Sequence, residues 1–238
     1  MRINVFNYYQ PIVDIDFKCV GFEVLLRGFF KGEIVGAAEC LDEIASGYGF
    51  VTLALNQINE VLSLRQEIKD VYFSINVTSD FFKSKEVIEF LDKIDVSHRR
   101  YIQFEILETV RFSSDVDMIY NAKKINSLGY MFKLDDFLSG ESSVFPFINF
   151  DFESIKIDLS VIANYKDNKR IEALLMTLIY YCSISNCNSI AEGVESIDVF
   201  YDLKSLGVSN FQGFLFSKPM PKSEVISNYK KLKKWIYL

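Results

Sequence analysis

The segment VYFSINVTSDFFKSKEVIEFLDKIDVSHRRYIQFEILE, residues 71–108, sets the pattern on which the fold prediction rests. It begins with a short apolar run, continues through a polar stretch of helical character and returns to a second apolar run. Runs of roughly four to eight residues that are rich in Val, Ile, Tyr and Phe are typical of buried strands. The segment therefore predicts a strand at 71–77, a helix at 85–94 and a strand at 102–108.

The alternation of strand-like and helix-like segments continues to the end of the chain, at a spacing of roughly thirty residues that is typical of a parallel sheet with crossover helices. Ser114-Asp115 and Asp167-Asn168 are predicted to cap the N-termini of two helices. Gly129 and Gly207 are predicted to end two helices. The other strands are expected at 5–14, 19–26, 131–136, 154–158, 189–193 and 210–215, and the other helices at about 36–47, 49–66, 115–128, 167–185, 197–206 and 222–235.

Eight strands and a comparable number of helices predict an α/β fold, a single (β/α)8 barrel of the TIM type that spans residues 1–238. The 238 residues, half of them hydrophobic, are enough for one such barrel or for two small domains. We favour one domain because no Gly/Ser/Pro-rich linker or low-complexity tract divides the chain. A doubly wound open sheet is the alternative, although the G-x-G-x-x-G phosphate turn of that fold is absent from the sequence.

The formal charge of −6 argues against a surface that binds DNA or RNA through its phosphates. The start of the chain has no signal-peptide pattern, and the longest apolar stretch, 173–184, is too short to cross a bilayer. In the tail YKKLKKWIYL (229–238), Leu232 and Trp235 are spaced to pack on the barrel rather than on a membrane. We therefore expect a cytoplasmic protein with no stable membrane insertion.

The residues that most often carry acid/base and thiol chemistry are scarce. The four cysteines show no C-x-x-C pair and are expected to be ordinary reduced, partly buried thiols. The single histidine, His98, lies in the polar stretch SHRRY and is expected in a solvated loop. Acid/base or metal chemistry must therefore rest on carboxylates, amides and lysines.

Acidic and amide side chains do stand at the downstream ends of the apolar runs, where parallel strands of a barrel place active residues. Each of these acids alone could be a helix cap, a surface strand end or half of a salt bridge. Together they are oxygen donors from separate segments, which is the ligand chemistry of Mg²⁺ or Mn²⁺. Asp135 and Asp136 can both serve only if the strand ends there and the chain bends. The side chains at the run ends are Asn76, Glu105, Glu108, Asp135, Asp136, Glu192 and Gln212. The oxygen donors that suggest a cation site are Glu23, Asn76, Glu105, Asp135 and Asp136.

Seven motifs in one order make the sequence recognisable. They are YYQPIVDIDFKCVGFEVLLRG, FSINVT, FEILE, KLDDF, IKID, IAEGVE and FQGFLFSKPM. The chain resembles the EAL-domain cyclic di-GMP phosphodiesterases over nearly its whole length. This resemblance implies a modified (β/α)8 barrel, two divalent cations, and cleavage of one phosphodiester of cyclic di-GMP to linear pGpG.

The resemblance also implies roles for individual residues. Glu23, Asn76, Glu105 and Asp135 look like the ligands of the first metal, and Asp135 and Asp136 like those of the second. Lys156 matches a lysine that contacts the water or the scissile phosphate. Glu192 matches a glutamate that handles protons or supports the metal. The catalytic residues that the resemblance implies are Glu23, Asp136, Lys156 and Glu192. Substrate contacts are implied for Gln10, Arg27, Asn76, Lys156, Glu195 and Gln212.

The chain departs from the family pattern at three places. Where the family usually reads E-x-T-E, this chain has Glu105-Ile106-Leu107-Glu108 and lacks a hydroxyl beside the site. Val24 replaces the alanine of the E-A-L triplet, which removes no oxygen donor. In the loop at 137–144, Leu138 stands where the family has a glycine, and leucine does not reach positive φ cheaply. In the family this loop couples metal binding to a homodimer contact and is anchored by the glutamate that matches Glu108. An active phosphodiesterase is the leading hypothesis, and a module that binds cyclic di-GMP or a protein partner without turnover is the alternative.

Overall fold

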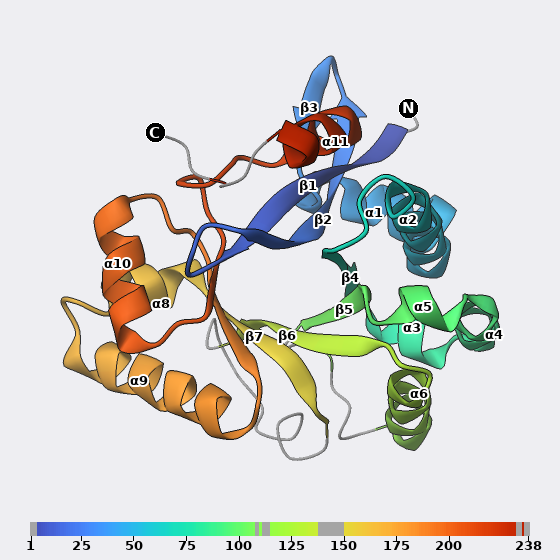
Figure 1. The fold of residues 1–238 in the computed structure, drawn as a ribbon. Coiled ribbons are helices and arrows are strands. Elements are labelled where there is room, and N and C mark those ends of the chain that lie inside the picture. Colours follow the sequence, from blue (N-terminus) through green and yellow to red (C-terminus); the bar gives the residue numbers. More distant parts are fainter. Residues whose placement is uncertain (1–3, 108–109, 111–114, 138–149, 232–234, 236–238) are drawn as a thin grey trace.

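In the computed structural model of the chain, a barrel of strands is surrounded by helices (Figure 1). The structure describes residues 4–107, 110, 115–137, 150–231 and 235. The strands are β1 (Asn4–Asp14), β2 (Cys19–Phe30), β3 (Glu33–Val35), β4 (Tyr72–Val77), β5 (Ile102–Leu107), β6 (Met131–Phe137), β7 (Phe152–Ile157), β8 (Asn188–Ala191), β9 (Asn210–Phe211) and β10 (Met220–Pro221).

Eight of these strands close into the barrel, in the order β1-β9-β8-β7-β6-β5-β4-β2, and the pairing of β1 with β2 completes the ring. The neighbouring pairs β2–β4, β4–β5, β5–β6, β6–β7, β7–β8 and β8–β9 are all parallel. Strand β1 is antiparallel to both of its neighbours in the ring. The closed ring confirms the predicted barrel over the open sheet, and the reversed first strand is the modification.

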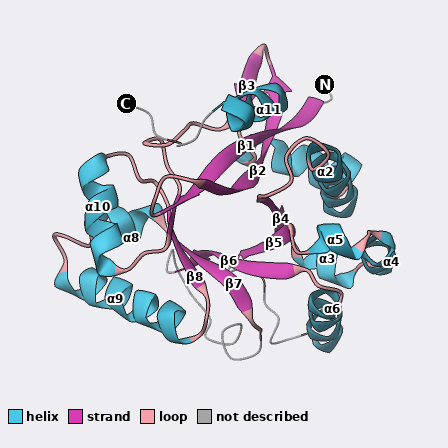
Figure 2. Cartoon of the chain, in the orientation of Figure 1, coloured by secondary structure: helices cyan, strands magenta, loops and turns pink. Residues whose placement is uncertain are grey.

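The helices lie outside the strands (Figure 2). They are α1 (Leu41–Glu43), α2 (Phe50–Leu64), α3 (Ser79–Lys83), α4 (Lys85–Lys93), α5 (Val96–Arg99), α6 (Val116–Ser127), α8 (Leu159–Asn164), α9 (Lys169–Ile184), α10 (Ile197–Leu206) and α11 (Lys222–Lys231). A 3₁₀ turn at Ala38–Cys40 precedes α1, and a π-helical turn at Ile44–Tyr48 follows it. The predicted helix at 36–47 is therefore three short turns rather than one regular helix.

Local sequence signals set several helix boundaries as predicted. The carboxylate of Asp115 accepts a hydrogen bond from the Met118 amide, and the Asn168 side chain accepts two from the start of α9. Gly207 ends α10 in the left-handed conformation, and Gly129 also has a positive φ of 96°. Ser114 of the first predicted cap lies outside the described residues.

The main core fills the space between the strands and the helices. In β4, for example, Phe73, Ile75 and Val77 belong to this core. Ser74 and Asn76 alternate with them and therefore face the barrel interior. At the end of the described chain, Trp235 is buried against Phe22, as the tail pattern predicted, while Leu232 lies outside the described residues. Within the described residues, no helix combines the length and the apolar character that a membrane span requires.

Some local expectations were wrong. The short elements α3, α5, α8, β3 and β10 were not predicted, and β9 ends at Phe211 instead of 215. His98 lies in helix α5 rather than in a solvated loop, and its Nδ1 accepts a hydrogen bond from Arg65 Nε at 3.2 Å. Strand β6 continues through Phe137, so it does not end at the paired aspartates, although its pairing with β7 is irregular between Leu134 and Phe137.

Strand β9 ends at Phe211, and just beyond it the backbone of Gly213 lies against the backbone of Val194. The Val194 amide donates to the Gln212 carbonyl, and the Val194 carbonyl accepts from Leu215. A Cβ on Gly213 would lie 2.1 Å from the Val194 carbonyl oxygen. This oxygen belongs to the backbone, so it cannot move aside as a flexible side chain could. This close approach fixes the segment after β8 against the segment after β9.

Gly213→Ala is therefore expected to lower the free energy of unfolding by about 2–3 kcal/mol, because the new methyl group forces two backbone segments apart. Urea unfolding followed by circular dichroism measures the change. Gly47→Ala is the matched control, since a Cβ there would meet nothing within 4 Å, and it should not lower the urea midpoint because alanine favours the helical turn more than glycine does. Equal midpoints for the two variants would contradict this account of the contact.

Candidate active site

The predicted site residues meet at the carboxyl ends of the parallel strands. Asn76, Glu105, Asp135 and Lys156 each lie near the end of their strands β4, β5, β6 and β7. Glu192 follows β8 directly, Gln212 follows β9 directly, and Glu23 lies in β2 opposite Gln10 of β1. Since parallel strands end at the same rim, the closure of the barrel brings these separate segments together.

Three carboxylates form the centre of the site. One oxygen each of Glu23, Glu105 and Asp135 lies within 4.8 Å of the other two. All three residues are buried, Glu105 completely. Burial of three carboxylates without compensating charge would be strongly unfavourable, so the cluster requires cations.

One such cation is the ammonium group of Lys156, which lies among the carboxylates. Its Nζ is 2.7 Å from Asp135 Oδ1, 3.0 Å from Glu105 Oε2 and 3.4 Å from Glu23 Oε2. A fourth carboxylate oxygen, Glu192 Oε1, is 2.6 Å away. Four carboxylates thus share one ammonium group at the centre.

The residues present fit divalent cations. The ligand atoms are carboxylate and amide oxygens, which are the donors that Mg²⁺ and Mn²⁺ prefer. The cluster keeps excess negative charge after Lys156 is counted, and the buried Glu105 Oε1 has no hydrogen-bond partner among the described residues. Buried carboxylates in excess of the buried ammonium group call for further positive charge, which divalent cations supply.

Burial and neighbouring charges shift the pKa values of the residues in the cluster in different directions. Burial raises the pKa of Glu23, and the charge of Lys156 only partly offsets this. Burial also acts to raise the pKa of Glu105, but Lys156 and Lys133 together bring it below its ordinary value. Burial raises the pKa of Glu192 to about 8. Although burial disfavours its charge, the four surrounding carboxylates hold the pKa of Lys156 well above its ordinary value.

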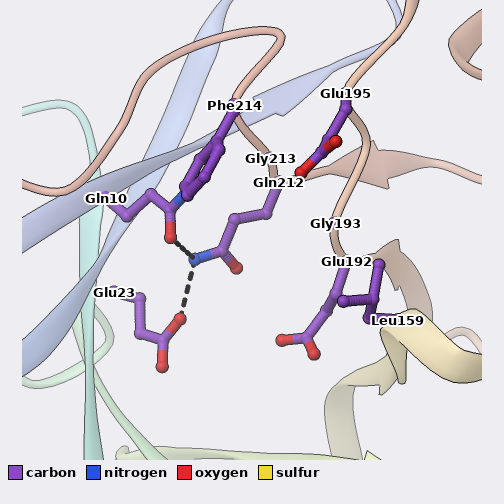
Figure 3. A pocket seen from close by; sticks show the side chains of 9 residues that line it. All are labelled: Gln10, Glu23, Leu159, Glu192, Gly193, Glu195, Gln212, Gly213 and Phe214. Carbon is purple, nitrogen blue, oxygen red and sulfur yellow. Dashed lines mark hydrogen bonds between the residues drawn. The ribbon is translucent and has the colours of Figure 1, made fainter. Parts of the chain in front are cut away.

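Amide side chains hold the carboxylate of Glu23 in place (Figure 3). Gln212 Nε2 donates to Glu23 Oε2 at 2.7 Å and also to Gln10 Oε1 at 3.1 Å. Asn76 Nδ2 donates to Glu23 Oε1 at 3.1 Å, which leaves the amide oxygen of Asn76 free to serve as a ligand atom. Gln10 in turn donates to the Ser217 carbonyl at 3.1 Å. Both oxygens of Glu23 are thus oriented by hydrogen bonds.

A pocket of about 250 Å³ opens beside the cluster. The carboxylates of Glu23 and Glu192 point toward each other across it (Figure 3). Phe214, with 49% of its surface exposed, offers an aromatic face to a ligand in the pocket. The lining residues are Gln10, Glu23, Leu159, Glu192, Gly193, Glu195, Gln212, Gly213 and Phe214.

The structure brings most of the predicted residues together but leaves Arg27 apart. Arg27 lies over the Tyr8 ring, donates to the Leu26 carbonyl at 2.8 Å and does not line the pocket. The side chain of Asp136, Glu108 and the loop from residue 138 lie outside the described residues, so their roles stay predictions.

Sequence analysis missed Lys133, which is fully buried beside Glu105, and it missed the aromatic lining at Phe214. The position of Lys133 inside the apolar run YMFKL is the sequence signal from which its burial could have been predicted.

Comparison with known proteins agrees with this geometry. The family model described as the EAL domain matches residues 2–219. The chain is 31% identical to the biofilm architecture maintenance protein MbaA of Vibrio cholerae, over 97% of this chain and 31% of MbaA. It is 30% identical to the cyclic di-GMP phosphodiesterase RocR of Pseudomonas aeruginosa, over 92% of this chain and 58% of RocR. The chain therefore spans less than two thirds of either relative.

A solved structure of similar size shows the same fold. The EAL domain protein from Listeria monocytogenes EGD-e superimposes with a TM-score of 0.79 and 26% identity, over 96% of this chain and 93% of that one. The similarity covers the barrel and the rim on which the carboxylates meet.

Proposed function

The chain belongs to the EAL domain family, and on that premise we propose that it hydrolyses one phosphodiester bond of cyclic di-GMP to give linear pGpG. The observation that carries the proposal is the convergence of Glu23, Glu105 and Asp135 around Lys156. The relative RocR, named a cyclic di-GMP phosphodiesterase, supports the choice of substrate.

The oxygen donors define where cations would bind. Glu23, Asn76, Glu105 and Asp135 would hold one Mg²⁺ or Mn²⁺ ion, and Asp135 and Asp136 a second. Two such cations, when bound, supply Lewis-acid charge beside the scissile phosphate. Gln212 and Asn76 keep the carboxylate of Glu23 in one orientation, so that the ligand geometry is formed before the substrate arrives.

Lys156 and Glu192 would act on the phosphate and the departing oxygen. The ammonium group of Lys156 stabilises the negative charge that grows on the phosphoryl oxygens. Glu192 Oε1 forms an ion pair with Lys156 Nζ. Burial raises the pKa of Glu192 to about 8, so its other oxygen, Oε2, can hold a proton at neutral pH. From there the proton can pass to the leaving ribose oxygen.

The pocket residues would bind the nucleotide itself. Gln10, Glu195 and Gln212 line the pocket and present polar groups to the substrate. Arg27 would contact a phosphate of the substrate with the guanidinium group that lies over the Tyr8 ring in this structure.

Product analysis tests this function directly, and it also tests metal removal. The purified chain with Mn²⁺ is expected to convert cyclic di-GMP to pGpG, and excess EDTA is expected to stop turnover because the cluster loses its cations. Chromatography of the nucleotides measures both, and added Mn²⁺ in excess of EDTA should restore the activity. Cyclic di-GMP that is bound but stays uncut with Mn²⁺ would favour the non-catalytic binding module instead.

A further inference from the structure

Lys133 is a charged group beneath the site that the proposed reaction does not use. It lies in β6, opposite Glu105 of β5, and its side chain is completely buried. Its Nζ is 3.6 Å from Glu105 Oε1 and 4.0 Å from the centre of the Tyr72 ring. Among the described residues, Nζ has no hydrogen-bond partner.

A buried ammonium group without a hydrogen bond is unfavourable for folding, because it has given up its water. The Tyr72 ring compensates part of that loss through a cation–π contact. Glu105 supplies the largest opposing charge. Lys133 is thus tied electrostatically to the carboxylate at the centre of the cluster, through Oε1, while Lys156 contacts Oε2.

The two lysines divide the oxygens of Glu105 between them. Oε1 lies toward Lys133, and Oε2 lies 3.0 Å from Lys156 in the cluster. Lys133 therefore helps to decide which oxygen of Glu105 the cluster presents. Its positive charge also repels any further cation that the same carboxylate binds.

We propose that Lys133 is a positioning residue that lowers the cation affinity of the site, because its charge on Glu105 opposes the binding of divalent ions. The proposal rests on the proposed function, in which the cluster binds such ions. Lys133 places one positive charge beside Glu105. Without it the cluster is more negative by one unit of charge, and a divalent cation is held more tightly.

The test is calorimetric titration of Mn²⁺ into the EDTA-treated, dialysed full chain at pH 7. Lys133→Met removes the charge but keeps the length of the side chain, and it is expected to bind Mn²⁺ at least about tenfold more tightly than the wild type. The rise in Tm on adding Mn²⁺ should increase in parallel. Lys93→Met, which changes an exposed lysine at the end of α4, is the matched control and should keep the wild-type affinity.

The sign of the effect separates this role from a merely structural one. A lysine that only supports the fold would weaken Mn²⁺ binding when replaced, so equal or weaker binding by Lys133→Met overturns the inference. Lys133→Gln is measured in parallel and carries the same expectation if the methionine variant folds poorly. A wild-type chain that takes up no Mn²⁺ would overturn the inference together with the proposed cation site.

Discussion

Lys156→Met is expected to lower kcat for cyclic di-GMP hydrolysis by about a thousandfold, since it removes the positive charge that stabilises the phosphoryl oxygens in a water-poor site. The lysine is almost completely buried and lies within 3.4 Å of four carboxylates, whereas the ion pair that the described residues give to Lys133 is with Glu105 alone. Steady-state kinetics on the Mn²⁺-loaded variant measures the loss. KM should change much less than kcat, because the charge acts mainly in the transition state.

The same substitution should also change stability in a metal-dependent way. Without Lys156, four buried carboxylates lose their shared counter-ion, and breaking a buried ion pair costs about 3–5 kcal/mol. The metal-free variant should therefore have a lower Tm than the wild type, and Mn²⁺ should restore most of the difference. Lys93→Met, which changes an exposed lysine at the end of α4, is the control for both measurements. Near-normal kcat in Lys156→Met would show that the lysine is only a structural counter-ion.

Glu105→Gln is expected to reduce kcat/KM by about a hundredfold or more, because a cation site that loses one carboxylate charge binds and polarises less strongly. Glu105 is the most central of the proposed ligands, since it is fully buried and contacts both Lys133 and Lys156. The glutamine keeps the shape of the side chain and one ligand oxygen, so the loss reports on charge. Raising the Mn²⁺ concentration should recover part of the activity.

A control lies on an outer helix. Glu89 of α4 is exposed, and the helices lie outside the strands that carry the site. Glu89→Gln should keep wild-type kcat/KM and the wild-type Mn²⁺ requirement. If Glu105→Gln behaves like Glu89→Gln, the central carboxylate does not hold a cation.

The sequence predicted the parts of the site that depend on strand order. Asn76, Glu105 and Asp135 each follow a short apolar run, and parallel strands that begin together also end together at one rim. Their convergence therefore follows from the alternation of strands and helices alone. The individual roles came from the motif resemblance, because spacing cannot distinguish a ligand from a substrate contact.

Other features depend on contacts that no local pattern encodes. Strand β1 pairs in the antiparallel direction with β2, which is adjacent in sequence, and with β9, which is remote. No local sequence pattern indicates these directions. The hydrogen bonds from Gln212 to Gln10 and Glu23 join positions about two hundred residues apart. Arg27 shows the converse case, because its motif predicted a phosphate contact while its side chain lies over the Tyr8 ring.

The central claim is that carboxylates from separate strands hold divalent cations at one rim of the barrel. Anomalous diffraction from a crystal soaked in MnCl₂ measures this most directly. We predict an anomalous peak in contact with oxygens of Glu23, Asn76, Glu105 and Asp135, with the ammonium group of Lys156 displaced from the centre of the carboxylates. A map in which Lys156 keeps its place among the four carboxylates, and in which manganese binds only elsewhere on the surface, would contradict the account.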